Sequence, residues 1–341
     1  MSLSHRSLAA GAALLALAAC SPQTDASTAP ESATAAAGRT SSASAPGLDV
    51  AAAHIMELRT AASGASNAAG AGGGGGTGIV YHGGPVLQSG TGVVAIYWAA
   101  SPIYTGGPAA NTTGPGSADG SLVGYFMSNL GGSPYFNINS TYTDGAGTKI
   151  VNAVNYSAYW ANGNNVPANG ASVSDAQMVA MLQAGLDAGS ITYSAGTLYA
   201  IFTAGTVNLG GGFGSKYCAY HTHGTVTVGG VAKNILYAAM PYDFAYPSGC
   251  TAQKASPNGD VAADAEVNTL AHEIEETTTD MMGNAWYDRR GYENADKCAW
   301  NWGATYATSN GGVANMKIGA KDFLVQQNWV NAGSGGCVLK Y

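Results

Sequence analysis

Charged residues are scarce in this sequence, and basic residues are the scarcest. Lys and Arg number 13 and Asp and Glu number 20 among 341 residues, so 10% of the chain is charged, against roughly 25% in an average soluble protein. The formal net charge is −7. Without a basic patch the chain cannot neutralise a run of phosphates, which excludes a nucleic-acid partner. The glycine runs "GGGGG" and "LGGGFGS" lack the Lys and the helix of a phosphate loop, so no nucleotide cofactor is expected.

Long hydrophobic runs are also missing. The apolar run at residues 7–20 is too short for a spanning helix. It follows Arg6, is typical of a signal-peptide core, and ends in "LAAC", which looks like a bacterial lipobox. We predict a lipoprotein signal peptide over residues 1–20 with a lipid on Cys20; the alternative is an ordinary cleaved signal and a chance cysteine. The protein is then exported, and its partner is the membrane through the lipid only, unless it is released as an extracellular protein.

Cysteine is rare, and its number is informative. After Cys20, four cysteines remain. An even number in an exported chain predicts two disulfides, and a four-thiolate zinc site is disfavoured because no C-x-x-C pair is present. Three pairings are possible, and proximity in the sequence favours Cys218 with Cys250 and Cys298 with Cys337.

The first part of the chain has the composition of a tether. Residues 21–76 are rich in Ala, Ser, Thr and Gly and cannot bury enough apolar surface to fold alone. Within them, residues 48–62 have some helical periodicity, which indicates a transient helix or part of a propeptide, and His54 is expected to be irrelevant. Residues 77–341 are predicted to form a single domain.

Strand and helix signals interleave in this domain. Apolar or alternating runs predict strands at 92–98, 148–160 and 197–204, and a hairpin with a Gly-Gly turn at 224–242. Helical spacing predicts helices at 117–131 and 172–189, the latter with a capping box of Ser174 and Gln177. The fold class is therefore α/β or α+β, with a mixed central sheet, flanking helices and a glycine-rich C-terminal part.

A further helix is predicted near residues 261–282, from an Asp260 cap to a stop at Gly283. It contains "AHEIEETTTD", which begins like the zinc-peptidase motif H-E-x-x-H but has Glu276 in place of the second histidine. Val267, Leu270, Ile274 and Met281 form an apolar stripe that should pack on the sheet. The motif lies on the opposite side of the helix, so the simplest alternative is the solvated polar face of an amphipathic helix.

The spacing of the motif suits a zinc ion. His272 and Glu276 are four residues apart and project from one side of a helix, and Glu273 beside them is placed to act as general base. A third ligand is expected from Glu293 or Asp296, which follow the helix after a short loop. Asp280 is a less favoured ligand because it lies two turns beyond His272. The crowding of acids supports a site, since seven of the twenty lie within residues 273–296.

A second histidine pair lies in "KYCAYHTHGT". His221 and His223 are two residues apart, which places both on one face of a strand. Either could be the third ligand or a group that stabilises the transition state opposite the metal. The alternative is a polar loop with exposed histidines.

Several of these segments together resemble the exordium, or phosphate-induced protein, family. The resemblance is carried by "GGPVLQSGTGVVAIYW", "YCAYHTHG", "SPNGDVAADAEVNTLA" and a cysteine close to the C-terminus, and it covers most of residues 79–341. Plant members of the family are regarded as extracellular growth-related proteins, and their motif helix carries apolar or small residues in place of His272, Glu273 and Glu276. Bacterial and fungal relatives are more similar to this chain, with H-E-x-x-E followed by an acidic E-x-x-D-x-C segment. The resemblance implies an extracellular fold and does not decide activity.

Two functions therefore compete. The first is an exported, lipid-anchored, peptidase-like zinc hydrolase that acts through the H-E-x-x-E helix. The second is a non-catalytic surface protein that binds polysaccharide or protein through its 19 Tyr and 6 Trp, with the metal absent or structural.

Overall fold

A computed structural model describes residues 54–59, 78–205, 207–210 and 212–341. The predicted signal peptide, Cys20 and most of the predicted tether lie outside these residues. Within the described ranges, no helix combines the length and the apolar character needed to cross a bilayer.

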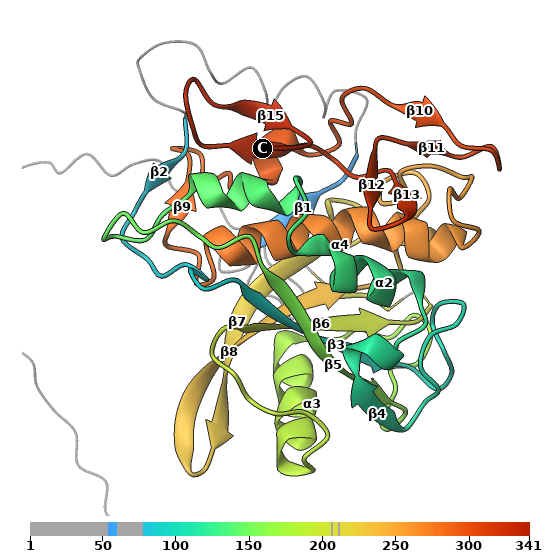
Figure 1. The fold of residues 1–341 in the computed structure, drawn as a ribbon. Helices are drawn as coiled ribbons and strands as arrows, with labels where there is room; N and C mark the ends of the chain where they lie inside the picture. Colours follow the sequence, from blue (N-terminus) through green and yellow to red (C-terminus); the bar gives the residue numbers. More distant parts are fainter. Residues whose placement is uncertain (1–53, 60–77, 206, 211) are drawn as a thin grey trace, which may run out of the picture. The chain divides into compact units, whose positions relative to one another are not determined.

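A seven-stranded mixed sheet forms the centre of the described part (Figure 1). In spatial order its strands are β1 (His54–Glu57), β7 (Tyr217–Val228), β8 (Val231–Met240), β6 (Thr197–Thr203), β3 (Thr91–Trp98), β5 (Val154–Asn162) and β4 (Thr112–Pro115). Strands β8, β6, β3 and β5 are mutually parallel, whereas β1, β7 and β4 pair antiparallel with their neighbours. The predicted mixed α/β class is confirmed.

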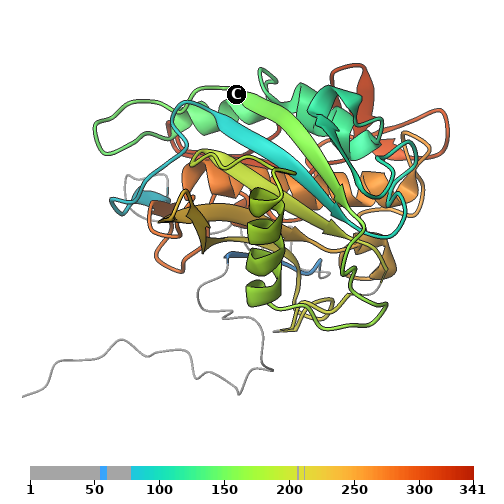
Figure 2. The ribbon, with the colours of Figure 1, turned by 90° about the horizontal axis from the view of Figure 1, so that it is seen from below.

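Helices cover both faces of this sheet (Figure 2). On one face lie α2 (Leu122–Leu130) and α4 (Val261–Thr279), and on the other lies α3 (Asp175–Asp187). The capping box predicted for α3 is present, because Ser174 and Gln177 bond reciprocally. Alternate residues of β3 serve the two cores, with Val93 packed on the α2 and α4 side and Val94 on the α3 side. Strands that are buried on both faces in this way have nearly continuous apolar sequences.

Two predicted boundaries shift, and one predicted element is of the wrong type. Strand β5 begins only at Val154, and β7 extends back to Tyr217 before the Gly229-Gly230 turn. Residues 54–57 were expected to be helical or unstructured, but they form β1, which pairs with β7 at the edge of the sheet. A short apolar run does not show whether its apolar residues repeat with the period of a helix or of a strand. This segment forms a strand because β7 pairs with it.

Helix α4 runs between the sheet and the C-terminal part of the chain (Figure 1). It begins as predicted, with the Asp260 side chain accepting from the amide of Ala263, and it ends at Thr279, a few residues earlier than predicted. The C-terminal part is tied to the far side of α4, because the Gln326 amide donates to Asn268 Oδ1. As a result α4 is covered on every side.

The remaining elements are short. The two-stranded ribbons are β2 (Val80–Tyr81) with β9 (Trp286–Tyr287), β10 (Tyr306–Ala307) with β11 (Val313–Ala314), β12 (Met316–Ile318) with β13 (Lys321–Phe323), and β14 (Asn328–Val330) with β15 (Gly336–Val338). The 3-10 helices are η2 (Gly116–Ala118), η3 (Phe136–Thr141), η4 (Asp243–Ala245) and η5 (Asp296–Cys298). Of these, η5 contributes directly to the site described next.

Candidate metal centre

The H-E-x-x-E motif of α4 is completely buried. His272, Glu273 and Glu276 are 0% exposed, and the burial extends from Ala262 to Asp280. The alternative in which the motif is the solvated face of an amphipathic helix is therefore wrong. Sequence periodicity could not show this, because the covering segments come from distant parts of the chain.

One group of potential ligands joins α4 to η5. His272 Nε2 lies 3.0 Å from Glu276 Oε1 and 3.5 Å from Asp296 Oδ1. These three residues, named the α4 group below, each offer a ligand atom, and the three atoms lie within 4.8 Å of one another. One imidazole and two carboxylates form a donor set that suits zinc or another first-row divalent ion.

A second group joins β1, β7 and the loop before η5. Glu293 Oε2 lies 3.2 Å from His221 Nε2 and also contacts His54 Nδ1. His54 and His221 face each other because they are register partners in the β1–β7 pair, and their ring centroids are 5.1 Å apart. The ligand atoms of these three residues, named the β7 group below, also lie within 4.8 Å of one another.

Two glutamates of α4 lie between the groups. Glu276 reaches His272 through Oε1, and its Oε2 lies 3.5 Å from His221 Nε2. Glu273 can place a carboxylate oxygen within 4.8 Å of ligand atoms of both His221 and Glu276. Among the described residues, neither oxygen of Glu273 has a hydrogen-bond partner, and the same holds for Glu276 Oε2 and Glu293 Oε1. Buried polar atoms are normally satisfied, so four unpartnered carboxylate oxygens in one cluster indicate that a ligand belongs there.

The ionisable groups of the cluster strongly shift one another's pKa values. Burial raises the pKa of Glu273 to about 8, although His272 and His221 act in the opposite direction. Burial also acts to raise the pKa of Glu276, but the same two histidines outweigh it and lower that pKa to about 2. Burial and the nearby Glu276 raise the pKa of Asp296 to about 7. Neighbouring carboxylates outweigh burial and raise the pKa of both His272 and His221. Metal binding replaces protons on such ligands, so this network is suited to exchange protons for a cation.

The other predicted ligands take different positions. Asp280 is the C-cap of α4, and its Oδ1 accepts from the amides of Asn284 and Ala285 at 2.6 and 2.7 Å. His223 lies on β7 as predicted but is exposed, and no three-residue ligand group found among the described residues contains it. Glu293 and Asp296, considered above as alternatives for one position, belong to different groups.

His54 is the residue that the sequence interpretation missed. It lies in a segment of low complexity and was expected to be irrelevant, yet it contacts Glu293 in the β7 group. Glu293 raises the pKa of His54 to about 9. The available signal was the scarcity of histidine, since the chain has only six.

The two predicted disulfides are both present, with the favoured pairing. Cys218 bonds to Cys250, and Cys298 bonds to Cys337. The first anchors β7 close to His221, and the second anchors η5, which carries Asp296. Each disulfide therefore holds an element that supplies a potential ligand.

A separate pair of buried acids lies further toward the start of α4. The amide of Asp243 donates to Glu266 Oε2 at 3.3 Å, and Thr269 Oγ1 donates to Asp243 Oδ2. Both residues are 0% exposed. Burial raises the pKa of Glu266 to about 8, and burial together with Glu266 raises the pKa of Asp243.

We expect Glu266→Gln to stabilise the protein in a pH-dependent manner. An acid with a raised folded-state pKa favours folding while it is protonated, and this contribution is lost as pH rises from about 4.5 towards 8. The amide cannot ionise, so the variant should match the wild type near pH 4 and exceed it at pH 8 by on the order of 4 kcal/mol. Urea unfolding at the two pH values measures this, and a difference that is independent of pH would contradict it.

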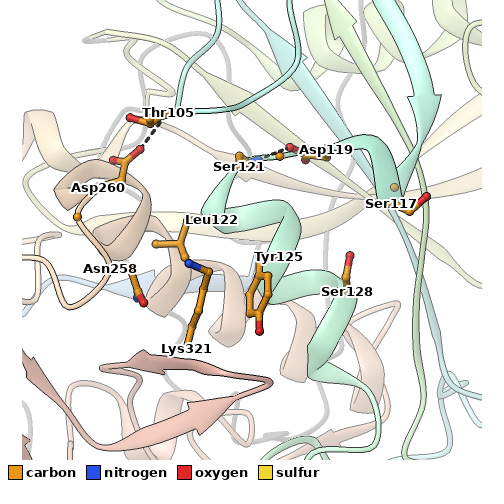
Figure 3. A pocket seen from close by; sticks show the side chains of 13 residues that line it. Thr105, Ser117, Asp119, Ser121, Leu122, Tyr125, Ser128, Asn258, Asp260 and Lys321 are labelled. Carbon is orange, nitrogen blue, oxygen red and sulfur yellow. Dashed lines mark hydrogen bonds between the residues drawn. The ribbon is translucent and has the colours of Figure 1, made fainter. Parts of the chain in front are cut away.

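A cavity of about 510 Å³ lies apart from the cluster, at the beginnings of α2 and α4 (Figure 3). Its carboxylates have partners: Asp119 Oδ2 accepts from Tyr97 and Tyr156, and Asp260 accepts from the amide of Thr105. The other polar side chains of its lining are Ser117, Ser121, Tyr125, Ser128, Asn258 and Lys321. Such a hydroxyl-rich lining suits a small polar ligand such as a sugar.

Comparison with known proteins identifies one related family. The model of the phosphate-induced protein 1 conserved region matches residues 131–323, which is more than half of the chain. The matched stretch includes α4, η5 and β7, and therefore every residue of the two ligand groups except His54. Comparisons with curated proteins and with solved structures gave no match.

Proposed function

This chain belongs to the phosphate-induced protein 1, or exordium, family, and from that premise we propose that it is an exported metal-dependent hydrolase of the peptidase type. Its ion is zinc, held by the α4 group. Export is supported by the two disulfides, which form in oxidising compartments, and by the signal-like sequence that precedes the described residues.

The proposal rests mainly on the environment of the Glu273 side chain. Its side chain is 0% exposed, and neither oxygen has a hydrogen-bond partner among the described residues. Burial of a carboxylate without partners is costly, so a purely structural site gains nothing from it. A buried carboxylate that no protein group in the described ranges occupies, beside potential metal ligands, is placed to act as a general base.

The residues then divide the work. His272 and Glu276 from α4 and Asp296 from η5 would hold the ion, which would supply a Lewis acid for the scissile carbonyl and for a water molecule. Glu273 would take a proton from this water as its oxygen bonds to the carbonyl carbon, and would pass that proton to the amine as the C–N bond breaks. Glu276 stands where the H-E-x-x-H motif has its second histidine, so this site is more anionic. A more anionic ligand set would weaken the effect of the ion on the pKa of the water.

A second candidate function is supported by the burial of the site. His272 and Glu276 are 0% exposed and Asp296 is 9% exposed, and a metal ion buried in this way can stabilise the fold without meeting a substrate. In that case the metal stabilises the fold, and the polar cavity at the beginnings of α2 and α4 would bind a sugar. Metal binding is common to both functions, and only the first requires Glu273.

Metal content tests the shared premise. The full chain, expressed with its disulfides formed and dialysed without chelator, is expected to contain zinc, and His272→Ala should lose one ion per chain. Glu275→Gln is the matched control, because Glu275 is equally buried on α4 but accepts from Asn139 and Asn328 rather than joining a ligand group. Elemental mass spectrometry gives the stoichiometry. A wild-type protein that takes up no metal after incubation with zinc would refute the hydrolase and any structural metal, and would favour a surface protein without metal.

A further inference from the structure

We propose that the β7 group, consisting of His54, His221 and Glu293, is a second divalent-metal site, with the Glu276 carboxylate lying between the two ions. Its own three ligands are separate from the α4 group, and only Glu276 would be shared, so the site can bind an ion whether or not the protein is a hydrolase.

The three donors of this site come from three elements and converge at one point. His221 Nε2 lies 3.2 Å from Glu293 Oε2, and His54 Nδ1 contacts the same oxygen. Two imidazoles and one carboxylate form a known zinc set, and such a set selects a first-row transition ion over magnesium or calcium. Glu293 and His221 are almost completely buried, at 0% and 1% exposure.

A buried oxygen atom without a hydrogen-bond partner in the described part of the chain gives independent support for a ligand. Glu293 is completely buried, and its Oε1 has no hydrogen-bond partner among the described residues. Its Oε2 is already shared by two imidazoles. An ordinary ion pair would leave the cost of the free oxygen uncompensated, whereas an ion bound here can be coordinated by it.

Glu276 connects this site to the first one. Its Oε1 faces His272 at 3.0 Å and its Oε2 faces His221 at 3.5 Å, so one carboxylate reaches toward both groups. Carboxylates in this position join the ions of two-metal hydrolytic centres, where the ions lie roughly 3.5–4 Å apart. The free Oε2 of Glu276 is thereby given a partner.

The charges of the cluster are compatible with two ions. Glu273, Glu276, Glu293 and Asp296 lie together in the interior, and histidines pair with Glu276, Glu293 and Asp296. The nearby ammonium of Lys297 is directed elsewhere, 3.4 Å from Asp288 and over the ring of Trp329. Four carboxylates and three imidazoles supply enough donors for two divalent ions, which would displace the protons that these groups otherwise hold.

Occupation of this site would fasten β1 to the rest of the sheet. His54 is the first residue of a four-residue edge strand that pairs with β7 and is also anchored by the buried Met56 and the hydrogen bond from Trp300 Nε1 to the Glu57 carbonyl at 2.8 Å. A metal bond to His54 adds a fixed point at the opposite end. Amide hydrogen exchange in β1 should therefore slow when the second ion binds, by about tenfold or more.

The test compares metal stoichiometry in full-length variants. The protein is stripped with a chelator, reloaded with zinc, and measured by elemental mass spectrometry together with hydrogen exchange of residues 54–59. We expect two ions per chain in the wild type, one in His54→Ala and one in Glu293→Gln, which keeps the side-chain shape. The matched control His223→Ala replaces an exposed histidine on β7, the strand of His221. It should retain two ions, and thermal unfolding verifies that each variant is folded.

The outcomes separate this proposal from the previous one. If the wild type binds one ion that His272→Ala removes and His54→Ala retains, the second site is refuted and the first stands. One ion that needs His54 and Glu293 but not His272 supports the second site and refutes the first. Two ions retained in folded His54→Ala, or none in the wild type, overturn the second site.

Discussion

Glu273→Gln is expected to lower the rate of peptide hydrolysis by about 10²–10⁴-fold while leaving metal content unchanged. Gln has nearly the same shape as Glu but cannot accept a proton from water. Glu273 is not a core ligand of either proposed site, so its replacement should spare the ions. Loss of rate with retained metal is the pattern that distinguishes a general base from a ligand.

The measurement uses a mixture of internally quenched peptides and the metal-loaded full chain. The values of kcat/KM for wild type, Glu273→Gln and Glu275→Gln are compared at equal metal content, and Glu275→Gln should remain active. Equal rates in wild type and Glu273→Gln would show that another group accepts the proton. A metal-loaded wild type that cleaves no peptide would instead favour the non-catalytic function, with the ion in a structural role.

The second large effect is expected from the disulfide next to the centre. Replacing Cys298 and Cys337 by Ser together should lower the free energy of unfolding by about 4 kcal/mol, because the bond closes a loop of 39 residues. The same change should weaken zinc binding, since η5 carries Asp296 two residues before Cys298. A free η5 has more conformations, and the ligand must be ordered when the ion binds.

Urea unfolding of the oxidised proteins measures the stability change, and titration with zinc measures the affinity. Replacing Cys218 and Cys250 by Ser provides a comparison, because that bond spans 32 residues and should contribute similarly to stability without touching η5. An unfolding free energy that changes by less than about 1 kcal/mol would contradict the expectation for Cys298 and Cys337. Equal effects of the two variants on the ion of the α4 group would show that η5 is positioned by packing alone.

The prediction of α4 illustrates what local sequence can establish. An Asp260 cap and a four-residue spacing of His272 and Glu276 depend on helix geometry alone, and both appear in the structure. The strands at 92–98 and 197–204 were equally clear, because strands buried on both faces need apolar side chains throughout. Of the three possible disulfide pairings, the one favoured by proximity in the sequence is the one present.

Long-range packing decided the rest. The acidic side of α4 is buried because β7 and the C-terminal segments both lie against it, and no periodicity within the helix contains that information. Glu293 and Asp296 could not be assigned to different ligand groups before the loop and η5 were placed.

His54 shows the same division most sharply. The segment that contains His54 is too short and has too few apolar residues to fold alone. The sequence by itself therefore predicted only a low-complexity tether there. Pairing with β7 supplies the hydrogen bonds that make it a strand and places its imidazole beside His221 and Glu293. Helix geometry and strand burial are local and can be read from sequence, whereas an edge strand and a shared ligand cluster form only when distant segments meet.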